Sequence, residues 1–271
     1  MIGAIIGDIV GSRFERHNCK SKDFLFFSTG CRFTDDTVMT LAVCDALLRW
    51  EEAGRKENLS DFTIRSMREF GSKFPHRGYG GMFSQWLYQK DPPKPYNSFG
   101  NGAAMRVSGC GYVAKTLDEA KELSRAVTAV THNHPEGIKG AEAVTLAVFL
   151  AINGKFKDEI KEYIEKNYYT MDFTIDSIRE KYSFDVTCQG SVPQALEAFF
   201  ESNSFEDAIR NAISIGGDSD TIGAITGAVA EAYYGVLENL RGCALAYLSD
   251  EAKDYLFAFE KMYPPRELLK K

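Results

Sequence analysis

Apolar residues recur at helical spacing along most of this chain, whereas the alternation of apolar and polar residues typical of half-buried strands is nearly absent. The clearest example is DTVMTLAVCDALLRW, residues 36–50, where apolar side chains return every three or four positions. Such spacing places them on one face of a helix. We therefore expect an all-α fold, a compact orthogonal helical bundle. Residues 1–271 should form a single domain, because no change in composition marks a linker.

The same pattern predicts further helices, at residues 2–14, 60–74, 103–115, 117–131, 135–152, 156–167, 174–182, 192–202, 205–215, 220–235 and 250–262. A short helix should follow the glycine-rich turn that begins RGYGGMF at Arg77, and a loop with Pro92, Pro93 and Pro95 comes after it. Residues 16–33 have no regular pattern. Within them, DFLFF could be a short strand or a buried loop.

Charge and composition exclude several classes of function. The net charge is −6 and no basic block occurs, which argues against a general nucleic-acid or membrane-surface binder. No apolar run approaches the ~20 residues that span a bilayer. The N-terminus lacks a basic region and Asp8 interrupts its apolar residues, so it is not a signal peptide. The six cysteines are scattered, as reduced thiols are. We expect a cytoplasmic monomer.

Two clusters of oxygen-bearing side chains open two of the expected helices. They are Thr34, Asp35 and Asp36, and Asp218, Asp220 and Thr221. Aspartates before a helix are commonly N-caps, and that alternative would explain either cluster alone. Two acidic clusters flanked by residues that look buried would repel one another without cations. Carboxylate and hydroxyl oxygens are the ligands of Mg²⁺ and Mn²⁺. We therefore predict that the clusters meet and hold a pair of these divalent cations.

Glycines recur at every fourth position in two of the helices. Gly3, Gly7 and Gly11 lie in the first, and Gly223 and Gly227 lie in the helix that follows the second acidic cluster. Glycine weakens a helix interior, so this spacing indicates close packing that compensates for the loss. We expect tight packing behind the metal site rather than a membrane dimer.

Three other features could contact a ligand. Glu15 follows the first helix; a lone glutamate is usually a surface group, but here it could be a metal ligand or a general base. The loop NSFGNGAAMR, residues 97–106, could present N–H groups to a phosphate, although it is not a Walker A motif and glycine loops more often only turn the chain. Within it, Phe99 could stack on a ligand. His132 could be structural, and beside a hard-cation site we favour ligand contact over zinc binding.

Five segments, in this order, resemble the ADP-ribosylglycohydrolase family, which includes the dinitrogenase-reductase-activating glycohydrolase and the animal ADP-ribosyl-acceptor hydrolases. They are GDIVGSRFE at 7–15, FTDDTVMTLA at 33–42, FGNGAAMR at 99–106, THNHPEGIKGA at 131–141 and GGDSDTIGAITGAVAEAYYG at 216–235. The resemblance implies an all-α fold with a central cleft for two Mg²⁺ or Mn²⁺ ions and ADP-ribose. It also implies hydrolysis of the glycosidic bond between ADP-ribose and an acceptor, either a protein side chain or a small conjugate.

The resemblance assigns roles to individual residues by their positions in these five segments. The implied metal ligands are Thr34, Asp35, Asp36, Asp218, Asp220 and Thr221. The implied substrate contacts are Ser98, Phe99, Gly100, Asn101, Gly102 and His132. The catalytic candidates are Glu15, Asp35, Asp36 and Asp220. The arginine-directed bacterial enzyme of this family has an aspartate near the glycine turn. In this chain the turn reads Gly78-Tyr79-Gly80-Gly81, so that aspartate is absent. The acceptor is therefore left open between arginine, serine and other groups.

Two alternatives use the same residues differently. A metal-dependent phosphohydrolase would act on a nucleotide pyrophosphate, and an ADP-ribose binding module would keep the pocket without turnover. A phosphohydrolase of the haloacid-dehalogenase type is disfavoured, because its Asp-x-Asp-x-Thr spacing differs and it needs a preceding strand.

Overall fold

Helices joined by loops make up the described part of the computed structural model, residues 1–90 and 93–265. These residues contain no β-strand, only an isolated bridge between Gly100 and Thr187, and the all-α prediction is confirmed. The α-helices are α1 (Ile2–Gly11), α2 (Asp35–Glu52), α3 (Leu59–Lys73), α4 (Gly81–Tyr88), α5 (Ser108–Val113), α6 (Leu117–Thr128), α7 (Pro135–Ile152), α8 (Lys157–Asn167), α9 (Ile175–Ile178), α10 (Cys188–Phe200), α11 (Phe205–Ser214), α12 (Ser219–Tyr234), α13 (Glu238–Leu245) and α14 (Asp250–Met262). A short 3₁₀ helix, η1, spans Asn101–Ala103.

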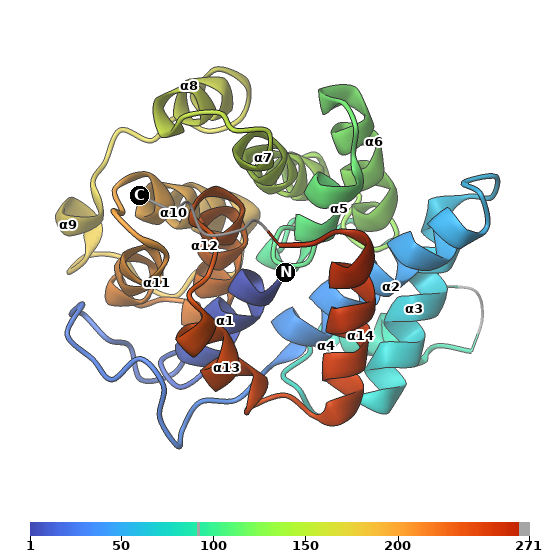
Figure 1. Ribbon diagram of the computed structural model, residues 1–271, viewed down its shortest axis with the longest axis horizontal. Coiled ribbons are helices and arrows are strands. Elements are labelled where there is room, and N and C mark those ends of the chain that lie inside the picture. Colours follow the sequence, from blue (N-terminus) through green and yellow to red (C-terminus); the bar gives the residue numbers. More distant parts are fainter. Residues whose placement is uncertain (91–92, 266–271) are drawn as a thin grey trace.

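Helices α1 and α12 lie side by side near the middle of the molecule, with the other helices around them (Figure 1). All ten residues of α1 are buried. Its glycines face α12: a Cβ on Gly7 or on Gly3 would lie less than 3.0 Å from the backbone oxygen of Gly223 or Gly227. The predicted close packing of the two glycine-bearing helices is confirmed. The backbones touch because neither helix has side chains at these positions.

The two acidic clusters sit where α2 and α12 begin. Thr34, not an aspartate, caps α2, because its Oγ1 accepts a hydrogen bond from the Asp36 amide at 3.3 Å. Asp218 occupies the N-cap of α12 but makes no capping bond with its side chain. Gly216 and Gly217 precede it with φ of 70° and 76°, a conformation that glycine adopts without strain. The aspartates are therefore not needed to cap these helices.

Several helix boundaries differ from the sequence-based predictions. The helix expected at 103–115 is divided into η1 and α5, because the chain turns between them at the buried Arg106. The helix expected at 174–182 is only the short α9. Helix α10 begins at Cys188 rather than at 192, since Thr187 accepts a hydrogen bond from the Gly190 amide at 3.0 Å. Helix α13 was not predicted; it contains Gly242 and lacks a capping side chain.

The connecting segments follow the predictions more closely. The turn at 77–81 leads into α4 as expected. Residues 23–27 form a loop rather than a strand, with Phe26 buried and Leu25 exposed. Pro92 of the predicted proline loop lies outside the described residues. None of the described helices is both long enough and apolar enough to cross a bilayer.

The α1–α12 contact predicts a large loss of stability when a side chain is added there. Gly7→Ala places a methyl group against the backbone of Gly223, and we expect the free energy of unfolding to fall by at least about 3 kcal/mol. Gly242→Ala is the matched control, because a Cβ there meets nothing within 4 Å. That control should be neutral or stabilising by up to about 1 kcal/mol in urea unfolding. Equal stability of the two variants would contradict the backbone contact.

Candidate functional site

Three buried aspartates from three different helices converge on one point. Asp8 of α1, Asp36 of α2 and Asp220 of α12 each offer a carboxylate oxygen, and these oxygens all lie within 4.8 Å of one another. The two acidic clusters also contact each other directly, since Thr221 Oγ1 donates to Asp36 Oδ2 at 3.2 Å. The structure therefore brings together the two clusters that the sequence analysis paired. A group of three carboxylates at this spacing could hold a metal ion.

Asp8 was not predicted as a site residue, although it lies in the segment GDIVGSRFE at 7–15. Its carboxylate accepts hydrogen bonds from the Thr34 amide at 2.9 Å, from Thr34 Oγ1 at 2.7 Å and from the Thr37 amide at 3.1 Å. Thr37 Oγ1 donates a further short bond. A carboxylate in an otherwise apolar helix was the available signal. These four donors hold Asp8 in one orientation between α1 and the start of α2.

Asp36 is held on one oxygen only. Oδ2 accepts from Thr221 Oγ1, and Thr34 Oγ1 lies 3.4 Å from the same atom. The other oxygen, Oδ1, is buried and has no hydrogen-bond partner among the described residues. A buried carboxylate oxygen without a donor is costly unless a cation or a proton satisfies it. Asp36 is thus held in an orientation in which Oδ1 could coordinate a metal ion.

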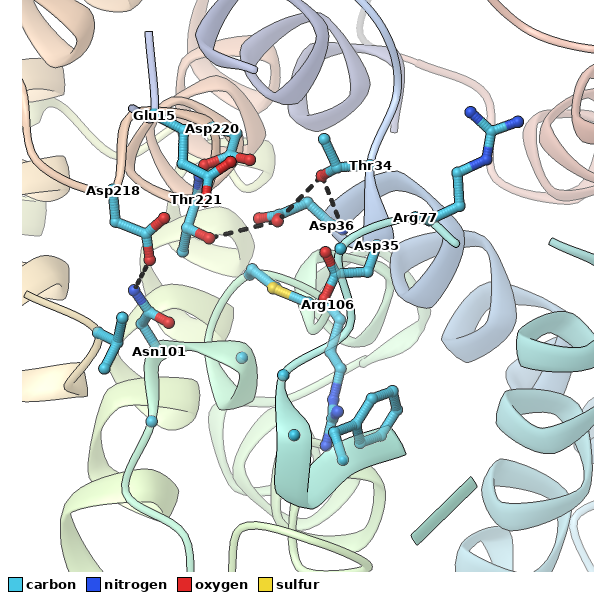
Figure 2. A pocket seen from close by; sticks show the side chains of 18 of the residues that line it. Glu15, Thr34, Asp35, Asp36, Arg77, Asn101, Arg106, Asp218, Asp220 and Thr221 are labelled. Atoms are coloured by element: carbon cyan, nitrogen blue, oxygen red, sulfur yellow. Dashed lines mark hydrogen bonds between the residues drawn. The ribbon is translucent and has the colours of Figure 1, made fainter. Parts of the chain in front are cut away.

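Asp218 connects the acidic cluster to the small-residue loop. Asn101 Nδ2 donates to Asp218 Oδ2 at 2.6 Å and also contacts Ser191 Oγ at 3.0 Å. Figure 2 shows Asp218 and Asn101 on one side of the site and Asp35 and Asp36 on the other. The loop and the helix start are therefore held in fixed relation before any ligand binds.

The electrostatics of the site favour bound protons or cations. Burial, followed by repulsion from Asp220, raises the pKa of Asp36 well above its usual value. Burial, followed by repulsion from Asp218, also raises the pKa of Asp220 well above its usual value. Burial and Asp8 raise the pKa of Asp35 to about 7. Burial also raises the pKa of Asp8, although its four hydrogen bonds oppose the shift. A divalent cation would remove this repulsion.

A cavity of about 490 Å³ opens beside the carboxylates, within the size range of small-molecule sites. Its lining includes the following residues predicted for the site: Glu15, Thr34, Asp35, Asp36, Ser98, Gly100, Asn101, Gly102, His132, Asp218, Asp220 and Thr221. Phe99 is the exception and is not among the residues that line the cavity. It is 41% exposed, and its ring centre lies 5.1 Å from that of His134.

Four arginines line the same cavity, and none of them was predicted as a site residue. They are Arg16, Arg32, Arg77 and Arg106. Within the described part of the chain, none of the four forms an ion pair with a carboxylate. Arg106 is fully buried, and burial lowers its pKa to about 10. The cavity thus combines a carboxylate cluster with unpaired positive charge on other parts of its wall, an arrangement suited to a ligand with both hydroxyl and phosphate groups.

A family model described as ADP-ribosylglycohydrolase matches residues 1–255. The chain belongs to the ADP-ribosylglycohydrolase family. Among its relatives, the ADP-ribosylhydrolase ARH3 of Xenopus tropicalis is 27% identical over 87% of this chain and 86% of its own length. The human ADP-ribosylhydrolase ARH3 is 25% identical over 87% and 84%. The ADP-ribosylarginine hydrolase Tri1 of Pseudomonas putida (strain GB-1) is 27% identical over 87% and 70%.

A solved structure described as an ADP-ribosylglycohydrolase-related protein complex shares the fold. It superposes with a TM-score of 0.67 over 97% of this chain and 95% of its own, at 22% identity. The all-α architecture of this member of the ADP-ribosylglycohydrolase family is therefore that of its structural relative.

The raised pKa values predict how the stability of the metal-free protein depends on pH. Asp35 keeps its proton in the folded state up to about pH 7, whereas the unfolded chain loses it near 3.8. The contribution of Asp35 to the free energy of unfolding is therefore fully present below about pH 4 and is lost as the pH rises through 7. In EDTA at pH 8, Asp35→Asn should be more stable than the parent protein by about 1–3 kcal/mol, and at pH 4 the two should be alike.

Thermal unfolding measured across this pH range tests the prediction. Asp254→Asn is the matched control, because Asp254 is exposed on α14. We expect no pH-dependent gain from it. A parent protein whose stability rises between pH 5 and 8 in EDTA would contradict the assignment.

Proposed function

We propose that this protein is a divalent-metal-dependent hydrolase that cleaves the glycosidic bond between ADP-ribose and an acceptor and releases free ADP-ribose. The convergence of Asp8, Asp36 and Asp220 beside a cavity of nucleotide size carries the proposal. Membership of the ADP-ribosylglycohydrolase family, and relatives named as ADP-ribosylhydrolases, support the same activity.

The donor atoms of the site fit hard cations. They are carboxylate and hydroxyl oxygens, with an unpartnered buried oxygen at Asp36 Oδ1, and this chemistry suits Mg²⁺ or Mn²⁺ better than zinc. We propose two cations, held by the following residues: Asp8, Thr34, Asp35, Asp36, Asp218, Asp220 and Thr221. When bound, the cations would supply Lewis-acid polarisation of substrate hydroxyls and of water.

The side chains of the chain itself have separable tasks in this proposal. Glu15 lines the cavity at a partly exposed position, where it could accept a proton from the attacking water. Asp35 is the other candidate for that role. The carboxylates would stabilise the positive charge that develops on the ribose ring as the glycosidic bond breaks. Ser98, Gly100 and Gly102 would bind the remainder of the nucleotide through the loop.

Release of ADP-ribose from a synthetic conjugate tests the proposal directly. We expect turnover with Mg²⁺ or Mn²⁺ and its loss in EDTA. Asp36→Asn should lower kcat/KM at least a hundredfold, because it removes a charged ligand, while circular dichroism shows the fold retained. Undiminished release in EDTA would refute the role of the metal.

The same assay separates the alternatives by their products. A phosphohydrolase would convert ADP-ribose to AMP, whereas the proposed enzyme leaves it intact. A binding module would hold ADP-ribose in calorimetry but release none from any conjugate.

The arginines on the cavity wall favour an acceptor without a guanidinium group. Arg16, Arg32 and Arg77 line the cavity and form no salt bridge among the described residues. Burial lowers the pKa of Arg77, the charges of Tyr79 and Asp8 oppose that shift, and the charge of Arg32 adds to it by a smaller amount. Like charges in an interface disfavour the wrong partner. The name of the Pseudomonas relative gives arginine as its acceptor, whereas the positive charge on this cavity wall leads us to propose a different acceptor for the present chain.

A panel of conjugates tests the choice of acceptor. We expect kcat/KM for a serine-linked conjugate to exceed that for an arginine-linked conjugate by at least about tenfold, the equivalent of one repulsive contact. Arg77→Gln should narrow the difference, and the exposed Arg65→Gln on α3 should leave it unchanged. Preference for the arginine conjugate in the parent protein would overturn this assignment.

A further inference from the structure

Arg106 is the most deeply buried arginine of the site, and its environment contains no ion-pair partner among the described residues. Only 1% of its surface is exposed, and its guanidinium carbon lies 5.6 Å from the centre of the Phe83 ring. In Figure 2 the side chain extends away from Asp35 and Asp36. A buried guanidinium is costly to desolvate. A charged side chain at this position therefore needs an explanation, which its hydrogen bonds provide.

The guanidinium ends against the pair formed by Thr131 and His132. Nη2 donates to Thr131 Oγ1 at 2.5 Å and lies 3.4 Å from His132 Nδ1. Thr131 Oγ1 lies 2.7 Å from the same ring nitrogen. The three side chains thus form a short hydrogen-bond relay that is buried throughout.

The direction of this relay follows from the chemistry of arginine, which donates hydrogen bonds and cannot accept them. Thr131 Oγ1 accepts from Arg106, and its own hydroxyl proton has two possible acceptors, His132 Nδ1 at 2.7 Å and the Thr128 carbonyl oxygen at 3.5 Å. The shorter distance favours donation to Nδ1. A proton on Nδ1 would instead face a guanidinium N–H, placing donor against donor. Nδ1 must therefore be the acceptor, and the ring proton of a neutral His132 lies on Nε2.

Nε2 lies on the cavity side of the ring, beside the small-residue loop. It is 3.4 Å from the position that a Cβ on Gly102 would occupy and 3.6 Å from that on Gly100, and all three residues line the cavity. The loop therefore leaves this nitrogen uncovered because its residues lack side chains there.

We propose that Arg106 is a positioning residue that fixes His132 as the neutral Nε2–H tautomer, so that His132 presents one N–H donor to an acceptor oxygen of the ADP-ribosyl group bound over the loop. The identity of that ligand rests on the proposed function. The assignment of the tautomer does not, because it is a property of the free protein.

Two consequences follow from the assignment. A protonated Nε2 has no lone pair for a metal, so His132 stays outside the cation site. Burial, and then the positive charge of Arg106, also lower the pKa of His132 well below its usual range. The donor is thus present in a single form, and the buried arginine excludes the cationic form that would otherwise compete with it.

Nitrogen-15 spectra of the histidine rings in the ligand-free protein test the tautomer. The chain has four histidines, and the signals of His132 are identified by their absence from a His132→Gln variant. We expect a protonated Nε2 and an unprotonated Nδ1, and addition of ADP-ribose should shift the Nε2 proton. A protonated Nδ1, a mixture of tautomers or an imidazolium in the parent protein would overturn the proposal.

Two variants test whether Arg106 acts through the relay. Arg106→Met removes the guanidinium, and Thr131→Val removes the hydroxyl but keeps the charge. Arg106→Met should give mixed tautomers and weaken ADP-ribose binding about tenfold, the loss of one hydrogen bond to a charged or polar oxygen. Thr131→Val should give a smaller fraction of the Nδ1–H tautomer than Arg106→Met, because the guanidinium N–H still faces Nδ1. Arg65→Met, on the exposed face of α3, is the control and should change neither property.

The outcomes of these variants are distinct. Weaker binding with an unchanged tautomer in Arg106→Met would show that the guanidinium contacts the ligand itself, and it would overturn the proposal. If Arg106→Met does not fold, Thr131→Val and the spectra of the parent protein still decide it. Absence of turnover on every conjugate would refute the proposed function but leave the tautomer measurable.

Discussion

Direct contact between the backbones of α1 and α12 determines where the carboxylates of this site can be. Glycines at every fourth position let the two helices approach until a methyl group no longer fits between them. That approach sets Asp8 on one helix beside Asp220 on the other, and the hydrogen bonds from Thr34 and Thr37 then bring the start of α2 to the same point. Close packing and the acidic cluster are therefore one structural arrangement.

The arrangement stores unfavourable electrostatic energy in the metal-free protein. Buried aspartates raise one another's pKa values, and Asp36 Oδ1 has no donor among the described residues. A sequence optimised for stability alone would replace such groups with apolar ones. The cations that we propose would account for their presence, because binding would convert the repulsion into binding free energy. Arg106, on another part of the cavity wall, is similarly costly and is explained by what it does to His132.

Sequence patterns predicted most of this fold because long helices carry their own periodicity. The acidic clusters were paired from the sequence because each combined hydroxyl and carboxylate groups at the start of an apolar helix, a combination that simple capping does not require. Contacts between residues far apart in the sequence could not be predicted from helical periodicity. Asp8 resembled an interruption, since only packing against α2 shows its four donors. The ring of Phe99 lies against His134 and does not line the cavity, so its stacking on a ligand stays a prediction. Helix α13 has neither a cap nor a strong periodicity and depends on its neighbours.

The central position of α1 also has a consequence for biosynthesis. The Gly3 amide donates to Glu231 on α12 at 2.7 Å, and these residues are 228 positions apart. Helix α1, which is apolar except for Asp8 and its glycines, is thus made well before α12, the helix it packs against most extensively. Tertiary structure around the carboxylates can form only after translation has passed α12, so nascent chains truncated before that helix contain no assembled site.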